Sequence, residues 1–261
     1  MTPQPSTPGR RNTIIALVLA VALLAIGGAA VAYVLVLRGS QVAPLALDTA
    51  APGTSSGAGT SSGAGTPSIA PGGSPALAAA DLPGTWAVAA DSLAGYRVRE
   101  QLANLAAESD AVGRTSAISG RAVLASQGAQ LVVSEAALTV DLTQLQSDDS
   151  RRDSQLSRQG VETAQFPTAS FKLTQPVTLP ADASSGAVVN VSLTGDLTLH
   201  GVTKQVSIPV QAQLQGSQIQ VAGSYTFPWA DFGMQKPTSF SVLSVADQAT
   251  LEFKLLLAKG S

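Results

Sequence analysis

Apolar and polar residues alternate through most of the chain from Leu82 onward, and this period of two is the feature that most limits the possible folds. Between Val189 and Leu199 one face carries apolar side chains and the other carries Asn, Ser, Thr and Asp side chains; a similar run from Val206 to Leu214 follows a short turn. Strands with one buried and one wet face are typical of antiparallel sheets. Some eight or more such runs within about 175 residues, without helical crossovers, predict a closed up-and-down barrel or a sandwich.

One segment, Ser147 to Gly160, interrupts the alternation. Asp148 and Asp149 near its start are good amino-terminal caps, and the glycine at its end is a common helix stop. We therefore expect a short helical insertion here. Its charged residues would form a solvated helix surface or, alternatively, take part in gating the barrel: Arg151, Arg152 and Asp153.

Branched aliphatic side chains dominate the strand faces that would point into a barrel, and aromatic residues make up 4% of the chain. A barrel of about eight strands can hold one small ligand when its inward side chains leave room. We expect an apolar lumen without an aromatic plug. The candidate ligand-binding residues of this lumen are Ile118, Leu124, Leu138, Val140, Phe171, Leu193, Leu197, Leu199, Val206, Ile208 and Val221.

Glu100 falls, by alternation, on the same face as Tyr96 and Val98. A carboxylate that faces an apolar lumen is costly unless it is paired, so it should meet Arg121, Arg114 or a ligand hydroxyl. The simpler alternative is that Glu100 lies near the end of its strand and reaches water. Glu100 and Arg121 are candidate polar contacts for a ligand head group.

His200 is the single histidine of the chain, and it precedes Gly201 between two predicted strands. A structural role in the turn is the favoured interpretation, because glycine supplies a permissive backbone and a polar side chain can bond to nearby backbone groups. A metal site needs three or four donors, and the chain offers neither a second histidine nor a cysteine. A catalytic triad lacks a serine in a suitable turn. A head-group contact at the barrel mouth is the remaining alternative.

The stretch from Thr13 to Leu37 carries no charge over 25 residues, which makes about 37 Å of helix and is enough to cross a membrane. A cleaved signal peptide is the alternative, but its apolar region is usually shorter. Arg10 and Arg11 precede the stretch and Arg38 alone follows it closely, so residues 1–12 should be a cytoplasmic tail. We expect a single-pass protein of the cell membrane with the rest of the chain on the extracytoplasmic side.

Residues 38–81 are rich in Ala, Gly, Ser, Thr and Pro and contain a tandem TSSGAG repeat. Such a composition buries too little surface to offset the entropy of ordering, which predicts a disordered linker. As a flexible coil of about 40 residues it would reach on the order of 35 Å. The linker would tether a barrel domain over residues 82–261.

Charge and cysteine content exclude several classes of protein. Beyond Arg38 the chain has 12 basic and 17 acidic residues, so its net charge there is 12 minus 17, or −5, which argues against a nucleic-acid partner. With no cysteine, neither disulfides nor thiolate chemistry is available. We expect no metal and no cofactor, and a soluble domain that is monomeric.

Several blocks resemble the YceI-like family of bacterial envelope proteins over about residues 82–259. They are GTWAVAADSLAGYRVRE, AVGRTSAISGRAVL, LTVDLTQLQSDDSRRDSQL, FPTASFKL, GDLTLHGVTKQVSIPV and DFGMQKP, in this order. The resemblance implies a lipocalin-like antiparallel barrel that holds a polyisoprenoid or a similar long-chain amphiphile in its lumen. Many members are soluble periplasmic proteins, whereas this chain has an expected anchor.

Three classes of function follow. The favoured one is a membrane-tethered lipid-binding protein that is not an enzyme and that stores or transports an isoprenoid or other long-chain lipid. A structural or interaction β-domain of the cell envelope without a ligand is the first alternative. An envelope enzyme that acts on lipids is the second, but no acid, base and nucleophile set converges in the sequence.

Overall fold

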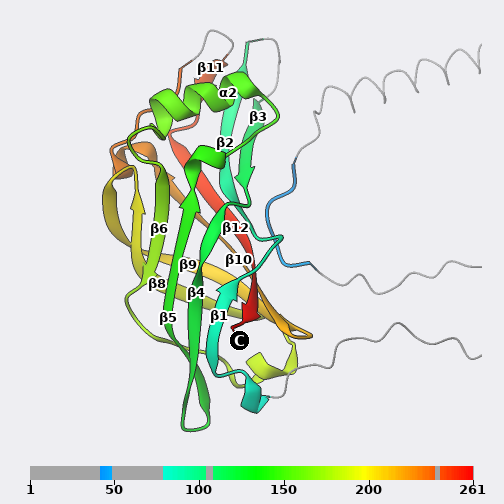
Figure 1. Cartoon of the computed structure of the whole chain (residues 1–261). Helices are drawn as coiled ribbons and strands as arrows, with labels where there is room; N and C mark the ends of the chain where they lie inside the picture. The colour runs from blue at the N-terminus through cyan, green and yellow to red at the C-terminus, as the bar shows by residue number, and fades with distance from the viewer. Residues whose placement is uncertain (1–41, 49–78, 104–107, 239–241, 261) are drawn as a thin grey trace, which may run out of the picture. The chain divides into compact units, whose positions relative to one another are not determined.

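The computed structural model describes residues 42–48, 79–103, 108–238 and 242–260, and in these residues the predicted strands form a closed antiparallel barrel (Figure 1). The twelve strands are β1 (Gly84–Val88), β2 (Leu93–Leu102), β3 (Glu108–Thr115), β4 (Ile118–Gln127), β5 (Gln130–Asp141), β6 (Thr168–Leu173), β7 (Val177–Thr178), β8 (Val189–Leu199), β9 (Val202–Gln215), β10 (Gln218–Pro228), β11 (Val242–Val245) and β12 (Gln248–Lys259).

Eight of these strands form the ring, in the order β1-β4-β5-β6-β8-β9-β10-β12, and β1 closes it by pairing with β12. All the pairings are antiparallel, and most ring neighbours follow one another in the chain, which is the up-and-down arrangement. The predicted barrel is therefore confirmed over the sandwich. β2 also pairs with β12, beside the β1 pairing, and carries β3 and β11 as an extension of the wall.

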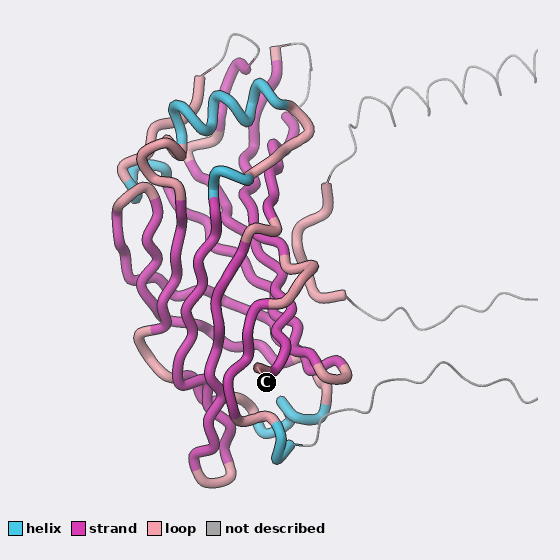
Figure 2. Tube along the Cα trace, viewed as in Figure 1, coloured by secondary structure: helices cyan, strands magenta, loops and turns pink. Residues whose placement is uncertain are grey.

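Short helical segments lie at the two ends of the barrel, as Figure 2 shows by colour. They are η1 (Ala79–Asp81), η2 (Leu142–Gln144), α2 (Ser150–Gln155), η3 (Leu156–Gly160), η4 (Ala181–Ser185) and η5 (Trp229–Phe232). The Asp149 side chain caps α2 by accepting a hydrogen bond from the Arg151 amide at 2.8 Å, and η3 continues as a π turn to Gly160. The predicted helical insertion is thus confirmed.

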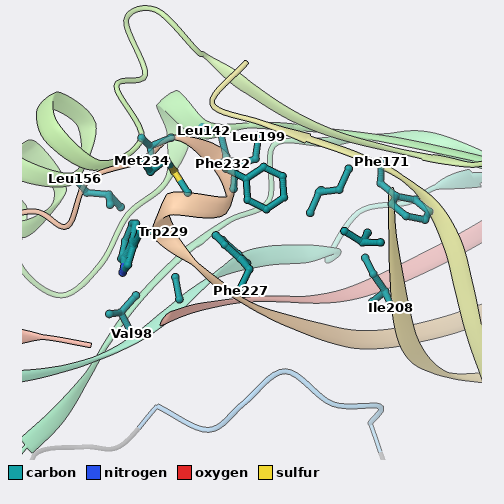
Figure 3. Packing of buried hydrophobic residues seen from close by; sticks show 14 of the residues in the cluster. Val98, Leu142, Leu156, Phe171, Leu199, Ile208, Phe227, Trp229, Phe232 and Met234 are labelled. Carbon is teal, nitrogen blue, oxygen red and sulfur yellow. The ribbon is translucent and has the colours of Figure 1, made fainter. Parts of the chain in front are cut away.

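Two apolar clusters fill the two ends of the barrel. The larger one lies beneath α2, at the end that we call the α2 end, and it contains Phe227, Trp229 and Phe232 (Figure 3). The smaller cluster surrounds Trp86, which is fully buried, and we call this the Trp86 end. The expectation of a lumen without an aromatic plug is therefore wrong. The aromatic residues are few, but they gather where the barrel must be closed.

None of the helices in the described ranges is long and apolar enough to cross a membrane. The expected membrane span, Thr13–Leu37, lies outside these ranges, and so does the TSSGAG repeat of the expected linker. Two parts of that linker are described, residues 42–48 and η1. Residues 43–48 belong to the same compact unit as the barrel and make hydrogen bonds to its wall, so the expectation of a linker disordered throughout 38–81 does not hold for these residues.

Candidate functional site

The barrel encloses an apolar cavity of about 240 Å³. Its walls come from seven of the eight ring strands, all except β1, because these strands turn alternate side chains inward. Gly195 on β8 contributes by its lack of a side chain: a Cβ atom there would lie 2.5 Å from the ring of Phe171. The phenyl ring therefore occupies space over Gly195 that any other residue would fill. The cavity can accept an apolar chain but offers it almost no polar partner.

The predicted lumen residues are placed together by the structure. All of them line the cavity except Val206, which is buried in the core beneath α2 instead: Ile118, Leu124, Leu138, Val140, Phe171, Leu193, Leu197, Leu199, Ile208 and Val221 are the lining members. The alternation of β8 holds throughout, since Leu197 is buried whereas Thr198 bonds to Thr203 on the exposed side. The period of two was sufficient to choose the inward face of each strand.

Other lining residues were missed. Those on strands carried the same signal, since Leu251, Phe253, Leu255 and Leu257 of β12 alternate in the same way as the predicted set. Leu142, directly after β5, continues the alternation of Leu138 and Val140. The other lining residues at the α2 end carried no such signal, because they come from loops and short helical segments: Leu145, Leu156, Val161, Trp229 and Met234.

Trp229 anchors the segment that closes the α2 end. Its indole Nε1 donates a hydrogen bond to the Ala246 carbonyl oxygen at 3.0 Å, while its ring lies beside Leu156 and Val98 in Figure 3. Phe227 and Phe232 meet edge to face, with ring centroids 5.1 Å apart. This closure is built from side chains, and a hydrogen bond holds its largest ring in place.

A second, smaller hollow of about 70 Å³ adjoins the α2 end of the cavity, between β2, α2 and β11. Tyr96, Leu156 and Trp229 line both spaces. Unlike the main cavity, the smaller hollow has charged walls, supplied by Glu100 and Arg152 among others. The three shared side chains therefore separate an almost wholly apolar space from one that is also lined by charged groups.

Glu100 is 5% exposed, and its carboxylate lies 2.6 Å from the guanidinium of Arg152. The same guanidinium lies 2.6 Å from Asp148, which is exposed. The expected partners of Glu100 were wrong, because Arg114 pairs with Glu252 and Arg121 is exposed on β4. Arg121, a predicted ligand contact, is nevertheless among the residues that line the main cavity. Water access for Glu100, the simpler alternative, is also wrong. Arg152 therefore ties α2 to the wall of the barrel, and the description of this helix as a merely solvated surface does not apply to Arg152.

Tyr96 adds an unusual polar group to this end of the lumen. Its hydroxyl is buried and has no hydrogen-bond partner of normal geometry among the described residues. Burial is the main cause that raises the pKa of Tyr96 above its ordinary value, and the positive charge of Arg152 acts in the opposite direction. The hydroxyl is neutral at physiological pH, so it can donate a hydrogen bond to a polar atom that reaches it.

His200 takes the place in the turn that the sequence favoured. His200 and Gly201 both have positive φ angles, 51° and 71°, as a two-residue hairpin loop requires. The imidazole Nε2 lies 2.7 Å from the Glu162 carboxylate, Nδ1 lies 3.2 Å from the Phe232 carbonyl oxygen, and the ring packs on Phe166. These contacts join three loops at the α2 end, and His200 is not among the residues that line the cavity. Within the described ranges no group of His, Asp and Glu side chains is arranged to hold a metal ion.

The Trp86 end is closed differently. Trp86 is 0% exposed, and its indole Nε1 donates to the Leu82 carbonyl oxygen at 2.9 Å. The strand that carries Trp86 pairs on both sides, with β4 and with β12. The plug at this end is therefore part of the barrel wall and is not a separate covering segment.

Comparison with known proteins places this geometry in a family. The model of the YceI-like domain matches residues 88–257, more than half of the chain. Among solved structures, the chain is similar to a polyisoprenoid binding domain from Saccharophagus degradans implicated in plant cell wall breakdown, with 17% identity over 68% of this chain and 99% of that chain and a TM-score of 0.49. It is also similar to BcnA of Burkholderia cenocepacia, with 21% identity over 62% of this chain and 95% of that chain and a TM-score of 0.44.

A further similar structure is the YceI protein of Campylobacter jejuni, with 18% identity over 57% of this chain and 85% of that chain and a TM-score of 0.42. A comparison with curated proteins finds no match. The match to the family model includes six ring strands in full, β4, β5, β6, β8, β9 and β10, together with the last residue of β1 and most of β12. The chain therefore belongs to the YceI-like domain family.

Proposed function

We propose that the barrel binds a long-chain lipid, most suitably a polyisoprenoid, in its apolar lumen, for storage or transport. The observation that carries the proposal is the cavity itself, which is walled mainly by inward apolar side chains from seven of the eight ring strands. If water filled this space, the apolar walls would stay hydrated and the protein would lose a burial free energy of about 25 cal/mol per Å² of wall. An alkyl or prenyl chain keeps the same walls out of water. The resemblance of the chain to a domain that is described as polyisoprenoid binding suggests the class of lipid.

The α2 end is the proposed position of the lipid head group. The apolar cavity, at about 240 Å³, is slightly smaller than the roughly 300–1,000 Å³ of typical ligand pockets, so a long chain needs more room than this space alone. The adjoining hollow extends it at the α2 end and supplies polar partners in Glu100 and Arg152. A ligand that reaches from one space into the other displaces Tyr96, Leu156 or Trp229, which separate them.

The proposal includes the place of the protein in the cell. The charge-free stretch Thr13–Leu37, preceded by Arg10 and Arg11, supports a single-pass anchor with the barrel outside the cytoplasmic membrane. A barrel in this position would exchange lipid with its own membrane.

Native mass spectrometry of the full chain, purified in mild detergent, tests lipid binding. We expect a bound lipid of defined mass whose removal lowers the melting temperature. Ala212→Phe, which projects a ring into the cavity, should reduce the bound fraction, whereas Gln211→Phe on the exposed side of the same strand should leave it unchanged. If no lipid is bound, added isoprenoid does not bind and the melting temperature is unchanged, the ligand-free structural barrel is supported instead. Chemical turnover of the lipid would support the enzyme alternative.

A further inference from the structure

The outer wall of the barrel carries a second feature, which lies on the opposite side of β10 and β12 from the lumen. Residues 43–48 (blue in Figure 1) lie along this wall without regular secondary structure. They precede the part of the chain that matches the family model, which begins at residue 88. Their contacts therefore lie outside the matched region.

Side chains of the barrel bind the main chain of this segment. The Glu252 carboxylate accepts a hydrogen bond from the Leu45 amide at 3.4 Å, and the Gln220 side chain accepts one from the Asp48 amide at 3.0 Å. In the other direction, Arg114 donates to the Ala43 carbonyl oxygen and Gln215 donates to the Asp48 carbonyl oxygen. Recognition of the main chain fixes the register of the segment but does not require a particular sequence.

The side chain of Asp48 supplies the specific contact. Its carboxylate oxygens lie 2.9 and 3.0 Å from Lys254 Nζ, and one of them accepts a hydrogen bond from Gln220 Nε2 at 3.2 Å. Gln220 thus holds both the amide and the carboxylate of the same residue. Among the residues of the segment, Asp48 is the one whose loss should release it.

The outer wall beneath the segment contains buried polar side chains. Glu252 and Gln220 stand on the outward faces of β12 and β10, where the alternation predicts exposure, yet they are 3% and 6% exposed. The Glu252 carboxylate is stabilised there by Arg114 at 2.9 Å and by Arg97 at 3.5 Å. Leu45 and Ala46 border a hollow with Ala222 of the same wall. The wall has the buried polar groups of an interface.

We propose that the outer wall of β10 and β12 is a docking site for the chain's own residues 43–48, and that this docking shortens the tether of the barrel. Residues 49–78, which connect Asp48 to η1, then join two points that are both held on the barrel and cannot act as a spacer. With the proposed anchor ending at Leu37, the free connection is residues 38–42. Such a stretch spans at most about 20 Å when fully extended, compared with a coil of about 40 residues for the whole linker. The consequence for the tether rests on the proposed anchor, whereas the docking itself does not.

Cross-linking in the full chain tests the docking directly, because the protein has no cysteine of its own. Ala46→Cys combined with Ser224→Cys, two exposed positions that border the same hollow and leave the Asp48–Lys254 ion pair intact, should react with a short bismaleimide to give an intramolecular cross-link. The matched control pairs Ala46→Cys with Lys172→Cys, an exposed position on β6, which is four strands from β12 in the ring. We expect the first pair to react at least tenfold faster, as measured by peptide mass spectrometry. Equal rates, or cross-links between two molecules, would overturn the proposal.

Hydrogen exchange of the Leu45 and Asp48 amides provides the second measurement. Asp48→Lys should accelerate their exchange by more than tenfold, and Asp48→Lys together with Lys254→Asp should restore protection by reversing the ion pair. Asp182→Lys on η4 is the control for the change of charge and should have no effect. Bound lipid mass should be the same in all these variants, so that failure of the docking is distinguishable from failure of the proposed lipid binding. Unprotected amides in the parent chain would refute the docking.

Discussion

Replacing Arg152 with leucine removes the guanidinium that lies 2.6 Å from the carboxylate of Glu100. Because Glu100 is 5% exposed, water cannot replace the lost partner without opening the segment that covers it. The variant therefore has to bury an unpaired charge or separate α2 from β2. Either outcome acts on the closure of the α2 end and not on the strands of the ring.

The magnitude follows from the burial of the two partners. Removing one member of a buried ion pair costs about 3–5 kcal/mol, because an uncompensated charge is left behind. The Arg152 side chain is 19% exposed, so we expect a loss of about 3 kcal/mol in the free energy of unfolding, at the lower end of that range. Glu100→Leu with Arg152→Leu removes both charges and should lie within about 1 kcal/mol of the parent chain. Asp148→Asn, at the exposed end of the same network, should cost less than about 0.5 kcal/mol.

Urea denaturation followed by circular dichroism measures these differences, and the three variants together form the test. A second readout is the rate at which bound lipid is lost, which should rise in Arg152→Leu if this ion pair holds the α2 end closed. The reasoning is refuted if Arg152→Leu is as stable as Asp148→Asn, or if the double variant is no more stable than Arg152→Leu.

Three further predictions concern the register, the buried tyrosine and the topology. Leu197→Glu places an unpaired carboxylate in the lumen and should lower the free energy of unfolding by several kcal/mol, as measured by thermal melts. Thr198→Glu on the outer face should lower it by less than about 1 kcal/mol. The reverse order would contradict the register. Burial raises the pKa of Tyr96 above 10.0, so its hydroxyl ionises at a lower pH in the unfolded chain than in the folded one. The free energy of unfolding should therefore fall as the pH rises above about 10, and Tyr96→Phe should weaken that fall. Protease added to intact spheroplasts should release a barrel-sized fragment, and full protection would show that the proposed orientation is wrong.

Much of the barrel wall was predictable because local alternation and burial agree. A residue on β8 such as Leu197 must face inward if its neighbour Thr198 faces water, and the closed ring then brings all inward faces to one cavity. The helical insertion was predictable for the same reason, since the Asp149 cap and the stop at Gly160 act within a few residues of the helix they bound.

The closures of the barrel were not predictable from local pattern. Glu100 and Arg152 are 52 residues apart, and nothing near either of them indicates that an arginine of a surface helix folds back onto β2. Trp229 and Met234 lie in an irregular segment, where no period assigns a direction to the side chain. The docking of residues 43–48 was missed because composition predicts the average behaviour of a linker, whereas the contacts depend on Asp48 meeting Lys254, 206 residues away.

The two closures differ in what opening them would require, and this difference indicates the route of a ligand. At the Trp86 end, the plugging ring belongs to β1, so moving it would break ladder hydrogen bonds to both β4 and β12 and expose a fully buried indole. At the α2 end, the covering helix has six residues, none of them buried, and is tied to the wall by the ion pair of Arg152 with Glu100. It continues into η3, whose Leu156 is buried in one cluster with Trp229, so opening this end exposes these side chains but breaks no strand pairing of the ring. A segment with few buried contacts opens at a lower free energy than the strands of a closed ring. A lipid that enters through the α2 end would insert its chain first, toward Trp86, and leave its polar head beside Glu100 and Arg152.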